Sequence, residues 1–273
     1  MSNRITLAFI GFGEVGQLFA RQLLANEQVS IAIYDLKLDR AETAPAMLEK
    51  AREIGVRVAK SAADAASGAS IILSAVTASA AEDVAREAAD YLRPGQVLFD
   101  LNSASPTTKA RAAKALVALG LSYVEGAVMA PVAAPGIKVQ ILTGGPEAER
   151  VSEALNALGM NLRPVATEIG RASATKLCRS IMIKGLEALI IDCDRAARHF
   201  GVKEDVFASL AVTFPSIDWP QLAEVMAGRV RQHGVRRAAE MRECGAMMDE
   251  IDLDGALARA IADTHERFAT PAK

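Results

Sequence analysis

The feature that most constrains the fold is residues 9–24, FIGFGEVGQLFARQLL. Gly11, Gly13 and Gly16 have the spacing G-x-G-x-x-G between an apolar, strand-like run and a helix-like one. In this setting the first glycine allows a tight turn, the second lets the backbone approach a pyrophosphate, and the third lets helix and strand pack closely. The helix start then offers free N–H groups and a positive dipole end to phosphates. The pattern predicts a dinucleotide-binding loop.

An acidic residue follows this loop at the expected distance. Asp35 ends a second apolar run, VSIAIYD (29–35), nineteen residues after Gly16. A carboxylate at this place accepts hydrogen bonds from a ribose and repels a 2′-phosphate, so NAD is the expected cofactor. Lys37 and Arg40 could still hold a phosphate, which keeps NADP open, and a glycine-rich turn that binds nothing is the alternative to both. The residues expected to line the cofactor are Gly11, Gly13, Glu14, Val15, Gly16, Asp35, Val76 and Thr77.

Strand and helix patterns alternate through the first half of the chain, which predicts a parallel, doubly wound α/β sheet. After Pro164 apolar residues recur at helical spacing without a convincing strand. We expect a dinucleotide-binding Rossmann domain over 1–164 and an all-α domain for substrate and oligomerisation over 165–273. The expected strands are 5–13, 29–35, 56–59, 69–76, 97–101, 121–128 and 138–145; the expected late helices are 172–200, 203–211, 219–232, 234–243 and 252–269.

Composition narrows the partners. Half of the residues are hydrophobic but only 4% are aromatic, as in Ala-rich helices with a buried subunit interface, so we expect a homodimer. A net charge of −2 argues against nucleic acid or an anionic membrane as a partner. The apolar run 115–137 is broken by glycines and prolines, so it is not expected to span a membrane. Three cysteines without metal spacing and a short N-terminal apolar run predict a cytoplasmic protein without a metal site.

A polar stripe marks the first late helix. Lys176, Ser180, Lys184 and Glu187 recur at intervals of four, four and three within an otherwise apolar stretch. At about 100° per residue they share one stripe roughly 80° wide. A solvent-facing stripe is the ordinary explanation, and spacing alone does not exclude it.

These motifs, taken in order, resemble the β-hydroxyacid dehydrogenase superfamily, which includes 6-phosphogluconate dehydrogenase and 3-hydroxyisobutyrate dehydrogenase. GFGEVG…YD resembles its cofactor loop, FDLNSASP (99–106) its segment between nicotinamide and substrate, and YVEGAVMAP (123–131) its substrate-binding loop. GRASATKLCRS (170–180) resembles its catalytic helix, and HGVRRAAEM (233–241) resembles the helical domain of a 6-phosphogluconate dehydrogenase-like branch. The resemblance spans nearly the whole chain.

The resemblance implies an NAD(P)-dependent oxidoreductase that moves a hydride between nicotinamide and the alcohol carbon of a small hydroxy acid or sugar acid. It implies that Lys176 is the general acid/base and that Ser180 donates to the substrate oxygen. A lysine in this role needs a lowered pKa, which burial and a second cation produce. Lys184 either supplies that cation or binds a carboxylate. Ser103 matches a serine near nicotinamide and substrate, although it could instead cap the helix that starts at Pro106.

The expected substrate-binding residues are Ser103, Met129, Ala130, Lys184 and Arg236. Arg236 and Arg237 project about 100° apart on a helix, so at most one of them faces a site, and an exposed face accounts for both equally well.

Two departures from the family pattern limit the substrate prediction. The family has Ser-Gly-Gly where this chain has Met129, Ala130 and Pro131, and proline has no N–H to offer a carboxylate. The asparagine four residues after the family lysine is Ser180 here. We therefore expect an acid held differently from 3-hydroxyisobutyrate. An imine reductase on the same scaffold is an alternative, although such enzymes usually lack the lysine; a non-catalytic NAD(P)-binding regulator is another.

Overall fold

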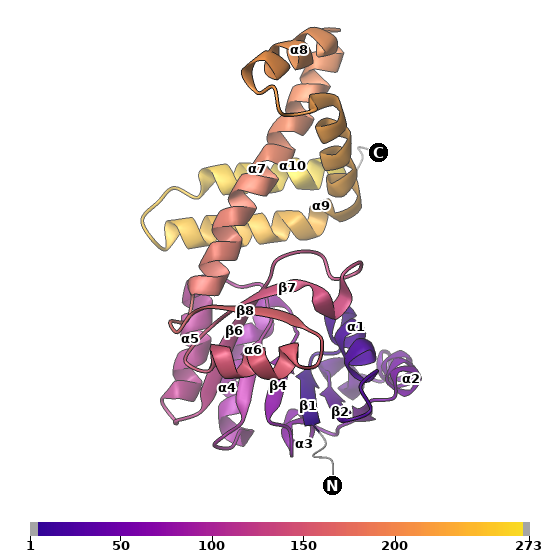
Figure 1. Ribbon diagram of the computed structural model, residues 1–273, viewed down its shortest axis with the longest axis vertical. Helices are drawn as coiled ribbons and strands as arrows, with labels where there is room; N and C mark the ends of the chain where they lie inside the picture. Colours follow the sequence, from indigo (N-terminus) through magenta and orange to yellow (C-terminus); the bar gives the residue numbers. More distant parts are fainter. Residues whose placement is uncertain (1–4, 270–273) are drawn as a thin grey trace. The chain divides into compact units, whose positions relative to one another are not determined.

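The computed structural model describes residues 5–269, and the chain divides into two compact units, Met1–Lys176 and Leu177–Lys273 (Figure 1). The first unit is built on one eight-stranded sheet in the order β3-β2-β1-β4-β5-β6-β7-β8. All neighbouring strands pair in parallel except β6 and β7, which are antiparallel. The strands are β1 (Ile5–Ile10), β2 (Val29–Tyr34), β3 (Arg57–Val58), β4 (Ile71–Ser74), β5 (Val97–Asp100), β6 (Ser122–Val128), β7 (Gln140–Gly144) and β8 (Asn161–Ala166).

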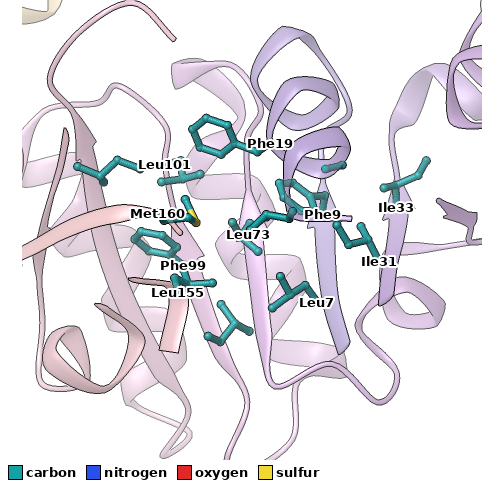
Figure 2. Packing of buried hydrophobic residues seen from close by; sticks show 14 of the residues in the cluster. Leu7, Phe9, Phe19, Ile31, Ile33, Leu73, Phe99, Leu101, Leu155 and Met160 are labelled. Atoms are coloured by element: carbon teal, nitrogen blue, oxygen red, sulfur yellow. The ribbon is translucent and has the colours of Figure 1, made fainter. Parts of the chain in front are cut away.

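Both faces of this sheet are buried, because successive side chains of a strand point to opposite faces. In β1, Leu7 and Phe9 belong to one apolar cluster while Ala8 and Ile10 belong to another. Figure 2 shows Phe9, Leu73 and Phe99 from three neighbouring strands within the first cluster. The first cluster includes residues of α1 (Glu14–Leu23), α2 (Ala44–Ile54) and α6 (Ala148–Asn156). The second includes residues of α3 (Ala62–Ala66), α4 (Ala81–Tyr91) and α5 (Pro106–Val117).

The strand order brings several loops to one edge of the sheet. The chain runs outward from β1 in both directions, so the order reverses between β1 and β4. In sheets of this kind, ligands bind outside the carboxyl ends of the strands at such a reversal. The loops that follow β1, β2, β4, β5 and β6 carry the glycine loop, Asp35 and the segments 75–77, 101–105 and 129–131.

The second unit is helical. Helix α7 (Arg171–His199) begins in the first unit and continues into the second, followed by α8 (Lys203–Thr213), α9 (Trp219–Asp249) and α10 (Ala256–Ala269). Side chains of α7, α9 and α10 form one apolar cluster, and side chains of α7, α8 and α9 form another. Helices α9 and α10 run antiparallel in close contact, since Gly234 lies against His265 and Gly245 lies against Arg259.

The predicted fold class, an α/β Rossmann sheet followed by an all-α part, is confirmed. Several details differ. The sequence analysis missed α3, α6 and β8. The expected helix ends at 232 and 243 are both wrong, because α9 is continuous from Trp219 to Asp249. The last helix begins at Ala256 rather than 252, after a turn in which Asp252 has φ +57°. Within residues 5–269 no helix is long and apolar enough to cross a membrane, and 115–137 forms the end of α5, then β6 and a loop.

Candidate active site

Two of the three loop glycines are required by close packing. Gly11 has φ +93°, and a Cβ there would lie 2.4 Å from the Ala75 carbonyl oxygen. A Cβ on Gly16 would lie 2.6 Å from the Gly11 carbonyl oxygen, so no larger residue lets α1 approach β1 this closely. Gly11 thus makes the turn and Gly16 makes the helix–strand contact that the motif predicts.

Gly13 faces open space. No atom beyond its own neighbours lies within 4 Å of the position that a Cβ would occupy there. Gly13 is the N-cap of α1, and no side chain in the described part of the chain caps that helix. The first N–H groups of α1 therefore lack a side-chain acceptor, as a pyrophosphate site requires. Glu14, the first residue of α1, is exposed.

Asp35 ties the glycine loop to the end of β2. Its Oδ2 accepts from the Phe12 N–H at 2.7 Å and its Oδ1 accepts from the Lys37 N–H at 2.9 Å. Each carboxylate oxygen has a second lone pair, so both can still accept from ribose hydroxyls. The side chains of Lys37 and Arg40 are exposed.

The ends of β4 and β5 are joined by Asn102, a residue that the sequence analysis did not single out. Its Oδ1 accepts from the Val76 N–H at 2.7 Å, and its Nδ2 donates to Ser74 Oγ at 3.0 Å. Val76 is half-buried and Thr77 is exposed. An asparagine directly after a predicted strand is a hint in the sequence of such a role. Its partners could not be predicted, because they lie 26 and 28 residues earlier.

The structure brings Lys176 and Ser103 together. Lys176 Nζ donates to Ser103 Oγ at 2.8 Å, and both side chains are half-buried in the first unit. Ser103 does not cap α5, because Ser105 is the N-cap and accepts from the Thr108 N–H at 3.2 Å. The capping alternative for Ser103 is therefore wrong.

The segment in the place of the family's Ser-Gly-Gly forms an apolar wall. Met129 packs with Ala127, Leu142 and Ala172 of α7. The Met129 N–H already donates to the Gln140 carbonyl at 2.9 Å. Ala130 and Pro131 are exposed.

Three members of the polar stripe are buried in the second unit. Ser180, Lys184 and Glu187 expose 4%, 5% and 0% of their surface, so a solvent-facing stripe is excluded for them. Ser180 Oγ donates to Glu240 Oε1 at 2.6 Å, and Lys184 Nζ lies 2.9 Å from the same oxygen. Lys184 Nζ also donates to Ser180 Oγ at 3.2 Å. Buried Ser180 and Lys184 and half-buried Glu240 thus form one mutually bonded group.

The two adjacent arginines of α9 point in different directions. Arg237 makes a two-nitrogen contact to the buried Glu187 carboxylate, whereas Arg236 is exposed. His265 of α10 lies 3.8 Å from Glu187 Oε2 and is fully buried. Burial, with the nearby Arg237 charge, lowers the pKa of His265 to about 4. Over residues 5–269, no three His, Cys, Asp or Glu side chains gather in a way that could hold a metal ion.

Similarity to known proteins shows the family of this chain. The model of the NAD binding domain of 6-phosphogluconate dehydrogenase matches residues 6–168, and a domain of unknown function, DUF1932, matches 197–268. A conserved hypothetical protein from Sinorhizobium meliloti is 40% identical, with 96% of this chain and 88% of that chain covered and a TM-score of 0.86. A conserved protein described as structurally similar to 3-hydroxyacid dehydrogenases is 30% identical, with 97% and 96% covered and a TM-score of 0.81.

A third structure, 3-hydroxyisobutyrate dehydrogenase of Mycobacterium tuberculosis with L-serine, is 17% identical over 97% of this chain and 94% of that one, with a TM-score of 0.78, and shows the shared fold. The glycine loop, the sheet and the helical second half thus define an NAD(P)-binding protein with the fold of the hydroxyacid dehydrogenases. The chain belongs to the family of the NAD binding domain of 6-phosphogluconate dehydrogenase and carries a DUF1932 helical region after it.

Proposed function

We propose that this protein is an NAD(P)-dependent dehydrogenase that oxidises the alcohol of a small hydroxy acid or sugar acid, with Lys176 as the general acid/base. The observation that carries the proposal is the 2.8 Å contact between Lys176 Nζ and Ser103 Oγ. Ser103 follows β5, so the pair belongs to the sheet edge that also carries the glycine loop. An amine beside a hydroxyl at this edge is placed to exchange a proton with a bound alcohol.

Each proposed role follows from a group that is present. When bound, the nicotinamide accepts the hydride from the alcohol carbon. Lys176, as the neutral amine, takes the hydroxyl proton at Nζ while the C–H bond breaks, so the alcohol becomes a carbonyl. Ser103 Oγ accepts from the amine and keeps its own O–H to donate to the substrate oxygen.

The proposed cofactor is NAD, held by Gly11, Gly13, Glu14, Val15 and Gly16 at the loop, by Asp35 at the ribose, and by Val76, Thr77 and Ser103. The carboxylate of Asp35 favours NAD because it repels a 2′-phosphate. Lys37 and Arg40 are exposed and could hold a 2′-phosphate, so NADPH is tested beside NADH.

The proposed substrate is an acid that is held without the family's carboxylate grip. The Met129 N–H is already used in the sheet, and Pro131 has none. For the helical unit, the roles of Ser180 as a donor to the substrate oxygen and of Lys184 and Arg236 in substrate binding stay proposals; within that unit Ser180 and Lys184 both contact the Glu240 carboxylate, and Arg236 is exposed. Met129 and Ala130 would form the apolar side of the site.

The test is a titration followed by an activity screen. NADH and NADPH are titrated into the purified protein by fluorescence, and NAD(P)H formation is then followed across hydroxy and sugar acids. We expect tighter binding of NADH and turnover of at least one acid that is lost in Lys176→Ala. Turnover that persists in Lys176→Ala would contradict the role of the lysine.

An imine reductase is the second candidate, because the wall at Met129 is apolar and imine reductases share this fold. Lys176 argues against it. Oxidation of NAD(P)H by a cyclic imine, with no oxidation of any acid, would favour this reaction. Tight cofactor binding without either reaction would favour a regulator.

We also propose that the protein is a cytoplasmic homodimer. Met182 and Leu189 lie seven residues apart on α7, and Phe200 directly follows the end of this helix; all three expose 70% or more of their surface. Large apolar side chains aligned on one helix face are typical of a subunit interface. The cytoplasmic part of the proposal rests on the sequence: the three cysteines, Cys178, Cys193 and Cys244, are odd in number and lack metal spacing, as in proteins of a reducing compartment.

A further inference from the structure

Two buried carboxylates of the sheet contact the two chain segments that carry Ser103 and Lys176. Asp100 and Glu125 are register partners on the parallel strands β5 and β6, and they expose 1% and 0% of their surface. Burying a carboxylate is costly unless hydrogen bonds and opposite charge compensate it. The bonds that these two acids make therefore indicate what each of them holds in place.

Asp100 holds the segment that carries Ser103. Its Oδ1 accepts from the Asn102 N–H at 2.8 Å and lies 3.0 Å from Lys109 Nζ, while Tyr123 donates to its Oδ2 at 2.6 Å. Lys109 is 1% exposed and also donates to the Asp100 carbonyl at 3.0 Å. Burial, followed by the Asp100 charge, raises the pKa of Tyr123 well above its usual value, so the phenol remains a donor. Asp100, Lys109 and Tyr123 thus form a network of hydrogen bonds and one ion pair that holds the start of the loop after β5 in place.

Glu125 holds the start of the helix that carries Lys176. Its Oε1 accepts from the N–H groups of Gly170 at 2.6 Å and Ala172 at 3.0 Å. Its Oε2 accepts from Ser173 Oγ at 2.6 Å and from the Ser173 N–H at 3.3 Å. Gly144 gives the carboxylate its room, because a Cβ there would lie 2.6 Å from Glu125 Oε1. A carboxylate from the sheet therefore takes the place of a helix cap at the N-terminus of α7.

We propose that Asp100 and Glu125 are paired positioning residues that set the distance between Ser103 Oγ and Lys176 Nζ. This inference rests on the proposed function of Lys176. Ser103 lies three residues after Asp100, and Lys176 lies about one helical turn after Ala172 and Ser173. Because the two acids are neighbours in one sheet, they place both segments relative to the same rigid element.

Stability alone does not account for this pair. A buried charge network often contributes no more to stability than apolar residues of similar volume, because desolvation offsets the attraction. What the network does fix is orientation, because each hydrogen bond holds one backbone N–H or one side chain in a defined position. Misplacing a reacting group by about 1 Å can cost about 10²-fold in rate, so such direction has a catalytic consequence.

The test uses Glu125→Gln in the full chain. Glutamine keeps the volume, but its amide nitrogen cannot accept from the N–H groups at the start of α7. The readout is trace acetylation of Lys176 by acetic anhydride as a function of pH, quantified by mass spectrometry, with amide exchange at Ala172 and Ser173. Neither measurement needs a substrate.

We expect a shifted pH profile for Lys176 labelling, faster exchange at both amides, and unchanged NADH affinity. On any substrate of the wild type, kcat should fall by about 10²-fold while KM changes little. Glu125→Asp, which keeps the charge, should recover part of the loss. Ser173→Ala removes one bond and keeps the carboxylate, so it serves as the milder variant if Glu125→Gln does not fold.

The matched control is Ser152→Ala. It removes another buried hydrogen bond of the same unit, between Ser152 Oγ and Thr143 Oγ1 at 2.9 Å, and among the described residues neither hydroxyl hydrogen-bonds to Asp100 or Glu125. This variant should lose stability but keep the wild-type labelling profile. The inference is overturned if the profile is unchanged in Glu125→Gln and Ser173→Ala, or if Ser152→Ala shifts it equally. Turnover by Lys176→Ala would refute the proposed function separately, because the labelling readout does not depend on it.

Discussion

His265 is a buried titratable side chain whose state depends on its surroundings in the second unit. Lys184 and Glu187 face it from α7, and Arg237 faces it from α9. Burial is the largest cause of its lowered pKa, and the charge of Arg237 adds to it. Glu187 could favour the charged ring, but its carboxylate is already taken by the two-nitrogen contact of Arg237. The folded protein therefore holds a neutral imidazole.

This arrangement predicts a pH dependence of stability. The pKa of His265 is about 4 in the folded state against 6.5 for a free histidine. Below pH 6.5 this histidine is protonated in the unfolded chain but stays neutral in the folded chain. Its contribution to the free energy of unfolding therefore falls as the pH drops from about 6.5 to about 4 and is constant below that. The loss from this group amounts to at most about 3 kcal/mol. We expect guanidinium unfolding of His265→Phe to show a flatter pH dependence over this range.

The control for this prediction is His199→Phe, which removes an exposed histidine and should keep the wild-type slope. Equal slopes for wild type and His265→Phe would contradict the assignment.

At the residue scale, local spacing predicted the glycine loop, because the roles of Gly11 and Gly16 depend on neighbours close in sequence or in the adjoining strand. That Lys176 and Ser103 share a site was predicted from the family resemblance and not from spacing. Spacing could not reveal Glu125, whose partners lie 45 to 48 residues away. Burial of charge is decided by the tertiary fold, so no local pattern signals it.

At the element scale, α9 contains a matched pair of glycines, Gly228 and Gly234. A Cβ on Gly234 would lie 2.5 Å from Ala269 Cβ and 2.6 Å from the His265 carbonyl, whereas Gly228 has open space around it. Alanine is a better helix former than glycine by about 1 kcal/mol. Gly228→Ala should therefore stabilise the protein by about 0.5–1 kcal/mol, and Gly234→Ala should destabilise it by about 1–3 kcal/mol through overpacking.

Thermal unfolding of the two variants beside the wild type measures this difference in sign. Stabilisation by both substitutions would mean that α9 and α10 do not approach as closely at Gly234 as the structure has them.

The same glycine explains an incorrect prediction. The sequence analysis expected a helix break at His233-Gly234, because glycine is unfavourable within helices. Here close contact with α10 selects the glycine and the helix continues. The missed strand β8 contains Pro164 and exposed polar residues, and it pairs only with β7 at the sheet edge, so it lacks the apolar pattern of a central strand.

At the scale of the whole molecule, the dimer proposal predicts a change in mass. Leu189 exposes 70% of its surface on α7 between Met182 and Phe200. Leu189→Glu places a charge in the proposed interface and should shift sedimentation at micromolar concentration from a dimer towards a monomer, because burying an unpaired charge is costly. Val117→Glu in the first unit, exposed by 58%, is the control and should leave the mass unchanged. A monomeric wild type would contradict the proposal.

The order of the motifs predicted the class of protein better than any one of them. The strand–helix alternation and the later helical pattern indicated the two-part architecture, and the family match to residues 6–168 agrees with the resemblance. The substrate could not be predicted in the same way. The proposed substrate-binding residues include Met129, at a place where this chain departs from the family pattern.

The central claim is that Lys176 exchanges the proton of the alcohol, and turnover by Lys176→Ala tests it most directly. The comparison uses the best acid of the screen, with NADH affinity measured on both proteins. Removal of a general acid/base is expected to lower kcat by about 10²–10⁴-fold while NADH affinity is retained. Undiminished kcat in Lys176→Ala would contradict the account.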